Sequence, residues 1–229
     1  RANSLEDAKI TAYHIGFVLG PCINASGRLD TAARSLALLN AKTKEEAARL
    51  AGDLTALNQS RKALTEKGKE EAIRIIETTE LKNDRVLVVY LPDCHESLAG
   101  IIAGRIREKY HRPAFVLTGG ETSAKGSGRS IESYSMYEEL VKYADLMIQF
   151  GGHPMAAGLS IEEKNIEEFR RRLNVNCTLT DEELRPKIVI DVPMPVSYIT
   201  KELVEQISLL EPFGKGNTKP VFAQKNLRV

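Results

Sequence analysis

The sequence predicts an α/β protein in which a long helical connector is followed by an α/β domain and then by the start of a separate β domain. Three observations support this class. Apolar residues recur at helical spacing over residues 43–78, and two short apolar strands flank an amphipathic helix over residues 85–118. After Asn176, prolines and glycines separate short apolar runs. We expect the connector at residues 1–80, the α/β domain at 81–178 and the β domain at 185–229.

The composition is that of an ordinary soluble globular protein. Of 229 residues, 42% are hydrophobic and 28% are charged, and the formal net charge is only +1, so a polyanionic partner must be bound by a local patch. No apolar run approaches the roughly 20 residues of a membrane helix, so we expect a cytoplasmic protein with no membrane partner. Cys22, Cys94 and Cys177 are far apart without a CxxC pair, which favours reduced thiols over disulfides or a zinc site.

The first 30 residues predict a helix that is interrupted once. Loose apolar spacing indicates a helix over Leu5 to Val18, and Gly20-Pro21 is expected to break it. Residues 22–30 are then predicted to form a turn. Arg28 lies in that turn, where it is either a solvated arginine or a partner of Asp30, or else a ligand-binding group.

The connector helix is the longest predicted element. Thr43 and Glu46 form a capping box, and helical spacing continues to about Thr78 despite Gly52 and Gly68. Some 34 residues at 1.5 Å each give a rod of about 50 Å. A helix of that length is more typical of a connector between two bodies than of a compact core.

Residues 85–118 predict a βαβ unit with parallel strands, made of strand 85–90, helix 98–110 and strand 113–118. His95 lies in the turn at the carboxyl end of the first strand, where α/β sheets bind ligands. It is equally well explained as a surface histidine near a helix start.

A glycine-rich segment follows, and we expect it to bind phosphate. Residues 123–131 predict a strand of small residues in which Gly126 and Gly128 flank Ser127 and Arg129 follows directly. Glycines allow close approach of a ligand, and a guanidinium beside a hydroxyl suits phosphate oxygens. A helix is predicted over residues 134–144, with a buried face formed by Met136, Tyr137, Leu140 and Val141.

A second glycine-flanked polar centre lies at Gly151, Gly152 and His153. With Pro154 as a first helical residue, free N–H groups and the imidazole would face one anion. His153 alone would more often be structural, but the combination with Ser127 and Arg129 favours a shared site. Residues 156–161 are small and apolar and lead into a helix over 162–174, whose arginines at 170–172 are either a solvated face or a phosphate contact. Beyond them we expect a strand at 187–192, a helix at 200–210 and a strand from Pro220.

These segments resemble the bacterial single-strand-specific 5′→3′ DNA exonucleases of the DHH phosphoesterase superfamily. Four motifs carry the resemblance over nearly the whole chain: residues 20–29, the His95-Glu96 turn with residues 125–130, residues 150–153, and residues 210–217. The resemblance implies that residues 81–178 form a mixed-sheet DHH-associated domain and that an OB fold begins near residue 185. Cys22 and Ser97 depart from the family pattern, which puts one phosphate contact and the approach of DNA to one turn in doubt.

The resemblance also implies roles. Arg28, Ser127 and Arg129, with Gly151, Gly152 and His95 beside them, would bind phosphates near the 5′ end of single-stranded DNA, and His153 would act on the scissile phosphate. No Asp-His-His sequence occurs, and the chain starts without methionine. We therefore expect a monomeric, inactive fragment that binds no cofactor, with Mn²⁺ or Mg²⁺ held by a missing N-terminal domain. The alternatives are a stand-alone nucleic-acid-binding module like that of alanyl-tRNA synthetase, or an oligoribonuclease-type phosphoesterase.

Overall fold

The computed structural model describes residue 5 and residues 9–226, and it divides into two compact units. The first unit comprises residues 1–26, 32–55 and 187–229, and the second comprises residues 27–31 and 56–186. Within the described part of the chain, no helix combines the length and the apolar character needed to cross a bilayer.

The N-terminal segment corrects one expectation. Of the helix predicted over residues 5–18, residues 6–8 lie outside the described residues. A π-helix, His14–Leu19, runs without a break into α1, Gly20–Leu29, so Gly20-Pro21 does not end the helix and residues 22–30 are not a turn. Proline normally clashes with the carbonyl four residues before it, and the wider π turn relieves this clash. A Cβ on Gly20 would lie 2.9 Å from the carbonyl oxygen of Ile15, which explains the glycine.

Two further helices follow, α2 (Ala33–Leu39) and α3 (Lys44–Thr78). Half of the capping box predicted at the start of α3 is confirmed: the N–H of Glu46 donates to Thr43 Oγ1 at 3.1 Å. The Glu46 carboxylate accepts from the N–H of Lys42, one residue before the N-cap, and not from that of Thr43. Gly68 has a packing role. A Cβ there would lie 2.6 Å from Ile102 Cδ1, so the glycine lets α3 pack closely against the α/β domain.

The α/β domain contains a five-stranded mixed sheet with the order β1-β2-β3-β5-β4. The strands are β1 (Leu87–Leu91), β2 (Ala114–Thr118), β3 (Ala124–Arg129), β4 (Met147–His153) and β5 (Ala156–Ile161). The parallel pairing predicted for β1 and β2 is confirmed, whereas β3, β5 and β4 pair antiparallel.

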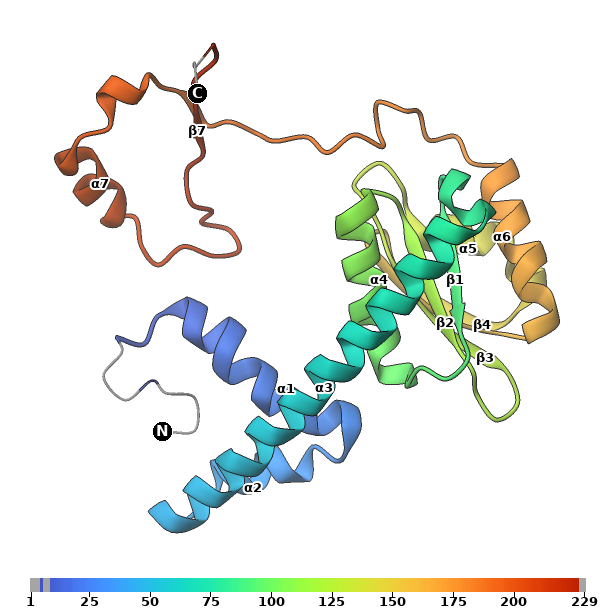
Figure 1. The fold of residues 1–229 in the computed structure, drawn as a ribbon, viewed down its shortest axis with the longest axis horizontal. Helices are drawn as coiled ribbons and strands as arrows, with labels where there is room; N and C mark the ends of the chain where they lie inside the picture. Colours follow the sequence, from blue (N-terminus) through green and yellow to red (C-terminus); the bar gives the residue numbers. More distant parts are fainter. Residues whose placement is uncertain (1–4, 6–8, 227–229) are drawn as a thin grey trace. The chain divides into compact units, whose positions relative to one another are not determined.

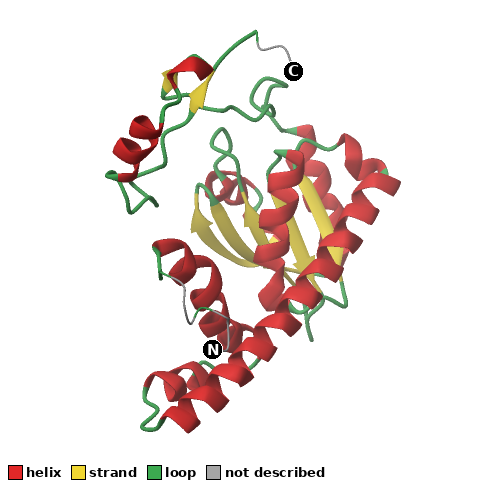
Figure 2. Cartoon of the chain, turned by 60° about the vertical axis from the view of Figure 1, so that its left-hand side comes forward, coloured by secondary structure: helices red, strands yellow, loops and turns green. Residues whose placement is uncertain are grey.

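Helices cover both faces of this sheet, as Figures 1 and 2 show. Their bounds are α4 (Glu96–Tyr110), α5 (Met136–Lys142) and α6 (Ile166–Val175). One core joins α4 and the C-terminal turns of α3 to β1 and β2 through residues such as Ile76 and Ile102. The other lies under α5 and α6, where the rings of Phe115 and Phe169 meet edge to face with centroids 5.4 Å apart.

The glycine-histidine segment corrects a second expectation. Gly151, Gly152 and His153 end strand β4, and Pro154 and Met155 turn the chain into β5. No helix starts at Pro154, so the proposed anion site at a helix N-terminus is wrong. Residues 156–161, predicted only to lead into the next helix, form strand β5, which lies between β3 and β4.

The C-terminal part contains less regular structure than expected. Its described residues contain β6 (Val192–Pro193) and β7 (Phe222–Ala223), which pair in parallel, a 3-10 helix (Val196–Tyr198) and α7 (Lys201–Ser208). The strand predicted over residues 187–192 is therefore wrong except at its last residue. Thr200 caps α7, since its Oγ1 accepts from the N–H of Leu203 at 3.2 Å.

The buried face of α5 is narrower than predicted and yields a stability test. Met136 and Leu140 are fully buried, but Tyr137 and Val141 are 43% and 50% exposed. Leu140→Ala should lower the free energy of unfolding by about 2–5 kcal/mol because it leaves a cavity. Val141→Ala should change it by less than about 0.5 kcal/mol. Urea denaturation of the two variants measures the difference, and equal costs would contradict the observed orientation of α5.

Candidate nucleic-acid interface

Strands β3, β5 and β4 align three rows of residues across the sheet. Residues opposite one another in antiparallel strands carry their side chains on the same face. The rows are Arg129–Ala156–His153, Ser127–Gly158–Gly151 and Lys125–Ser160–Gln149. Arg129 and His153 therefore lie in one row on one face, with Cα atoms about 10 Å apart across two strand spacings.

The side chain of Arg129 folds back along β3 toward Ser127. Its Nη1 donates to Ser127 Oγ at 3.1 Å and to the carbonyl oxygen of Gly128 at 2.7 Å. Among the described residues no carboxylate forms an ion pair with Arg129. Burial and, second, the nearby guanidinium of Arg28 lower the pKa of Arg129 below its usual value. The site thus already disfavours the positive charge that it holds, and an anion would relieve that cost.

Gly100 of α4 makes room for this arrangement. A Cβ on Gly100 would lie 2.7 Å from Arg129 Nη2 and 2.9 Å from Ser127 Oγ. One turn later, a Cβ on Gly104 would lie 4.0 Å from Arg129 Cγ, an ordinary contact. The two glycines form a shallow channel on α4 in which the arginine side chain lies, with its tip near the first turn of the helix.

Arg28 reaches the same region from the end of α1. Its Nη1 donates to the carbonyl oxygen of Ser97, in the first turn of α4, at 2.7 Å. This bond leaves most of the guanidinium donors of Arg28 available to a ligand. The structure therefore brings Arg28, Ser127 and Arg129 together, three residues that lie up to about 100 positions apart in sequence.

A cavity of about 580 Å³ opens beside this cluster. Its walls come from the first turn of α4 and from strands β3, β5 and β4: Glu96, Ser97, Ala99, Lys125, Gly126, Ser127, Gln149, Phe150, Gly151, Gly158, Leu159 and Ser160. In the middle row, Gly151 and Gly158 have no side chains, and together they form the base of the cavity, called the glycine floor below. A Cβ on Gly151 would meet no atom within 4 Å, so the missing side chains leave the cavity open.

The two histidines differ in their surroundings. His153 is exposed at the end of β4, and its Nδ1 accepts from the N–H of Met155 at 3.3 Å. No other described residue bonds to this imidazole, so its Nε2 is available to a ligand. His95 instead caps α4, because its Nδ1 accepts from the N–H of Ser97 at 3.3 Å. It lines a separate cavity of about 560 Å³ against α3, and the structure does not bring it to Arg129.

Two further predicted positions have structural explanations. Gly152 has φ +155°, and a Cβ there would lie 2.4 Å from the carbonyl oxygen of Ala156, so the turn requires glycine. The arginines at 170–172 all pair with carboxylates: Arg170 contacts Asp84 and Glu167, Arg171 contacts Glu168, and Arg172 contacts Glu168 and Asp145.

Sequence reasoning missed Gly100, Lys125, Gln149 and Ser160. Lys125 lies two and four residues before Ser127 and Arg129, so strand alternation alone places it on their face. Glycines at positions 100 and 104 of a predicted helix signal close packing against that face. Gln149 and Ser160 required recognition of the β4–β5 hairpin.

The donors of the cavity suit an anion. The cavity contributes the ammonium group of Lys125 and the hydroxyl groups of its serines, and the adjoining cluster contributes the guanidinium groups of Arg28 and Arg129. All of these donate hydrogen bonds to phosphate oxygens, whereas Mg²⁺ and Mn²⁺ prefer carboxylates and carbonyls. Within the described residues, no group of three or more His, Cys, Asp and Glu side chains is arranged to hold a metal ion.

Comparison with known proteins identifies two domains. The DHHA1 domain model matches residues 83–177, and the RecJ OB domain model matches residues 190–229. The chain is 37% identical over 224 residues to the single-stranded-DNA-specific exonuclease RecJ of Escherichia coli, covering 93% of this chain and 39% of that protein. It is 36% identical over 210 residues to RecJ of Bacillus subtilis, covering 90% of this chain and 27% of the relative.

A solved structure supports the same assignment. The crystal structure of Thermus thermophilus RecJ in complex with Mg²⁺ matches with a TM-score of 0.79 and 29% identity, covering 93% of this chain and 33% of the other. The same protein was also solved with Mn²⁺. This chain thus spans two fifths or less of the length of these relatives. It belongs to the RecJ family, in which it corresponds to the part that contains the DHHA1 and RecJ OB domains.

Proposed function

We propose that this chain is the substrate-binding part of a 5′→3′ single-stranded-DNA exonuclease. In this proposal the cavity beside Arg129 binds the backbone of single-stranded DNA near its 5′ end. The observation that carries the proposal is the proximity of Arg28 and Arg129, two partly buried guanidinium groups without a carboxylate partner among the described residues. Like charges are held together at a cost, which a phosphate dianion or phosphodiester would offset.

The position of each residue in the site determines the role that we propose for it. Arg129 and Arg28 bind phosphate oxygens from two sides, and the Ser127 hydroxyl adds a hydrogen bond at the same point. His153, in the row of Arg129, offers Nε2 to the phosphate that is cleaved and stabilises the negative charge that develops on it. The glycine floor lets the sugar-phosphate chain approach the sheet closely.

The bond cleavage itself requires groups from outside this chain. The relatives solved with Mg²⁺ and Mn²⁺ support metal-dependent hydrolysis, and such ions activate water and stabilise the leaving oxygen. Carboxylate ligands for them would come from the part of the relatives that this chain does not match. The full-length enzyme would act on DNA during repair and recombination.

Substitution of Arg129 tests the phosphate site. Arg129→Ala should weaken binding of a fluorescent 5′-phosphorylated oligothymidine by about 10- to 100-fold, because charge-assisted hydrogen bonds are lost. Arg129→Lys should restore only part of the affinity, since an ammonium lacks the planar fork. Fluorescence anisotropy at low ionic strength measures both. Arg171→Ala, which removes an equal charge from α6, is the control and should bind as the wild type does. Equal affinities for Arg129→Ala and Arg171→Ala would contradict the proposal.

Placing a side chain on the glycine floor tests whether single-stranded DNA crosses the sheet at that position. Gly151→Val should fold normally, because its Cβ meets open space and valine favours strands. It should weaken binding of the same oligonucleotide by about tenfold, the scale of one lost charge-assisted bond. Gly152→Val, at φ +155°, should instead lower the melting temperature. Unchanged binding by a folded Gly151→Val protein would exclude this path.

The purified 229-residue chain should bind single-stranded DNA weakly and should not cut it. Incubation of a labelled oligonucleotide with the chain and millimolar Mn²⁺, followed by gel electrophoresis, measures this. Manganese-dependent degradation that copurifies with the chain and disappears in His153→Ala would show that the chain carries its own catalytic groups.

A further inference from the structure

The third row of the sheet has polar side chains that the proposed phosphate site does not use. Lys125, Ser160 and Gln149 lie side by side on β3, β5 and β4, and all three line the cavity. Gln149 Nε2 donates to Ser160 Oγ at 3.4 Å. Lys125 Nζ lies 2.6 Å from Glu96 Oε2, at the start of α4. The row therefore combines an exposed cation, an exposed amide and a hydroxyl that is only 8% exposed, all on one wall of the cavity.

The ion pair of Lys125 is weakly held. The side chains of Lys125 and Glu96 are 54% and 51% exposed, and exposed pairs contribute little to stability. An incoming phosphate can therefore replace Glu96 as the partner of Lys125 at small cost. Ser160 and Gln149 would add hydrogen bonds to the same phosphate or to its sugar.

The spacing of the rows fits a chain of phosphates. The Cα atoms of Lys125 and Ser127 are separated by about 6.7 Å, two residues along a strand. Because Arg129 folds back to Ser127, its guanidinium lies near the middle row, one such step from Lys125. One extended nucleotide covers that step, and the glycine floor leaves space for its sugar.

We propose that Lys125, Ser160 and Gln149 form a second phosphate subsite, which binds the phosphodiester one nucleotide from the phosphate held by Arg129. When no DNA is bound, Glu96 forms the ion pair with Lys125. A phosphate of bound DNA replaces Glu96 as the partner of Lys125. The inference rests on the proposed function, because it assumes that single-stranded DNA enters the cavity.

The test measures binding of this chain to 5′-phosphorylated oligothymidine by fluorescence anisotropy over a series of salt concentrations. Lys125→Gln should weaken binding at low salt by about 3- to 10-fold and reduce the slope of log K against log salt by about 0.7, the value for one phosphate contact on a single strand. Glu96→Gln should tighten binding several-fold. In the Lys125→Gln background the same Glu96→Gln change should have little effect, because Glu96 acts through Lys125.

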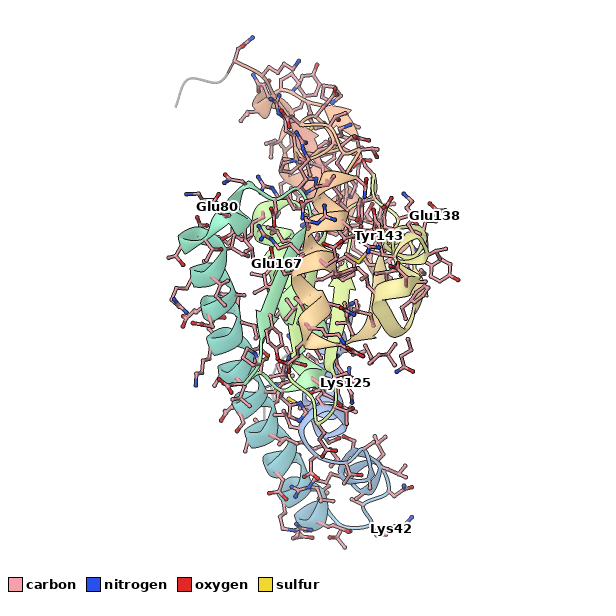
Figure 3. All side chains as sticks on the ribbon, turned by 90° about the vertical axis from the view of Figure 1, so that its right-hand side faces the viewer. Lys42, Glu80, Lys125, Glu138, Tyr143 and Glu167 are labelled. Atoms are coloured by element: carbon pink, nitrogen blue, oxygen red, sulfur yellow. The ribbon has the colours of Figure 1, made fainter. Side chains whose placement is uncertain are left out.

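Matched controls lie on α5, which packs against the opposite face of the sheet. Lys142→Gln and Glu138→Gln change the net charge equally, and in Figure 3 the labelled Glu138 lies on α5 away from the labelled Lys125.

Competition with short ligands shows which phosphate Lys125 binds. Lys125→Gln should leave the inhibition constant of thymidine 5′-monophosphate unchanged and raise that of the 5′-phosphorylated dinucleotide, which has a second phosphate.

The outcomes separate the two proposals. If wild-type binding depends on Arg129 but Lys125→Gln behaves as Lys142→Gln does, the second subsite is overturned and the proposed function stands. If Lys125→Gln weakens the monophosphate and the dinucleotide equally, Lys125 belongs to the first site and the subsite is also overturned. If the wild-type chain does not bind the oligonucleotide at low salt, both proposals fail.

Discussion

The arrangement of the site depends on two guanidinium groups held close together, with no opposing carboxylate among the residues that the structure describes. The Ser97 carbonyl fixes Arg28, while Ser127, the Gly128 carbonyl and the space above Gly100 fix Arg129. Neither contact neutralises a charge. The first two turns of α4 contribute to both, since Ser97 accepts one bond and Gly100 admits the other side chain. The position of α4 on the sheet therefore determines the geometry of the cationic cluster.

Strand β5 is the second constraint. It lies between β3 and β4, so the arginine segment and the glycine-histidine segment meet only through its pairing register. Ala156 and Gly158 of β5 have little or no side chain on the cavity face. Strand β5 thus leaves open space between β3 and β4, whose side chains carry the functional groups. A shift by one residue would turn Arg129 and His153 to opposite faces.

Much of the framework followed from local patterns in the sequence. The Thr43 cap and the βαβ unit are short-range signals, and both are confirmed. The helix break predicted at Pro21 is wrong because a π turn, which depends on packing, accommodates the proline. The helix start predicted at Pro154 is wrong because a hairpin turn favours proline as much as a helix start does. Tyr137 and Val141 fit helical spacing, but the width of a buried face is set by what packs on it.

The sequence predicts a phosphate-binding site, but only some of the residues that line the candidate site. Arg129 and Ser127 stand out because their glycine neighbours are unusual in a strand. Lys125 shares their face by strand alternation alone, whereas Gln149 and Ser160 have no glycine neighbours, and their position on that face follows only from the register of the three strands. The capping bond of His95 likewise depends on where α4 begins, two residues earlier than periodicity indicated.

The paired arginines of α6 have a kinetic consequence. With 32 basic and 31 acidic residues and with Arg170, Arg171 and Arg172 each matched to carboxylates, the chain offers little long-range attraction to a polyanion. Electrostatic steering raises association rates by orders of magnitude when a surface has a large net field, and this chain lacks one. Under the proposed function, encounter with single-stranded DNA would proceed at an ordinary diffusive rate, and anions would be discriminated after contact, by their dissociation rates.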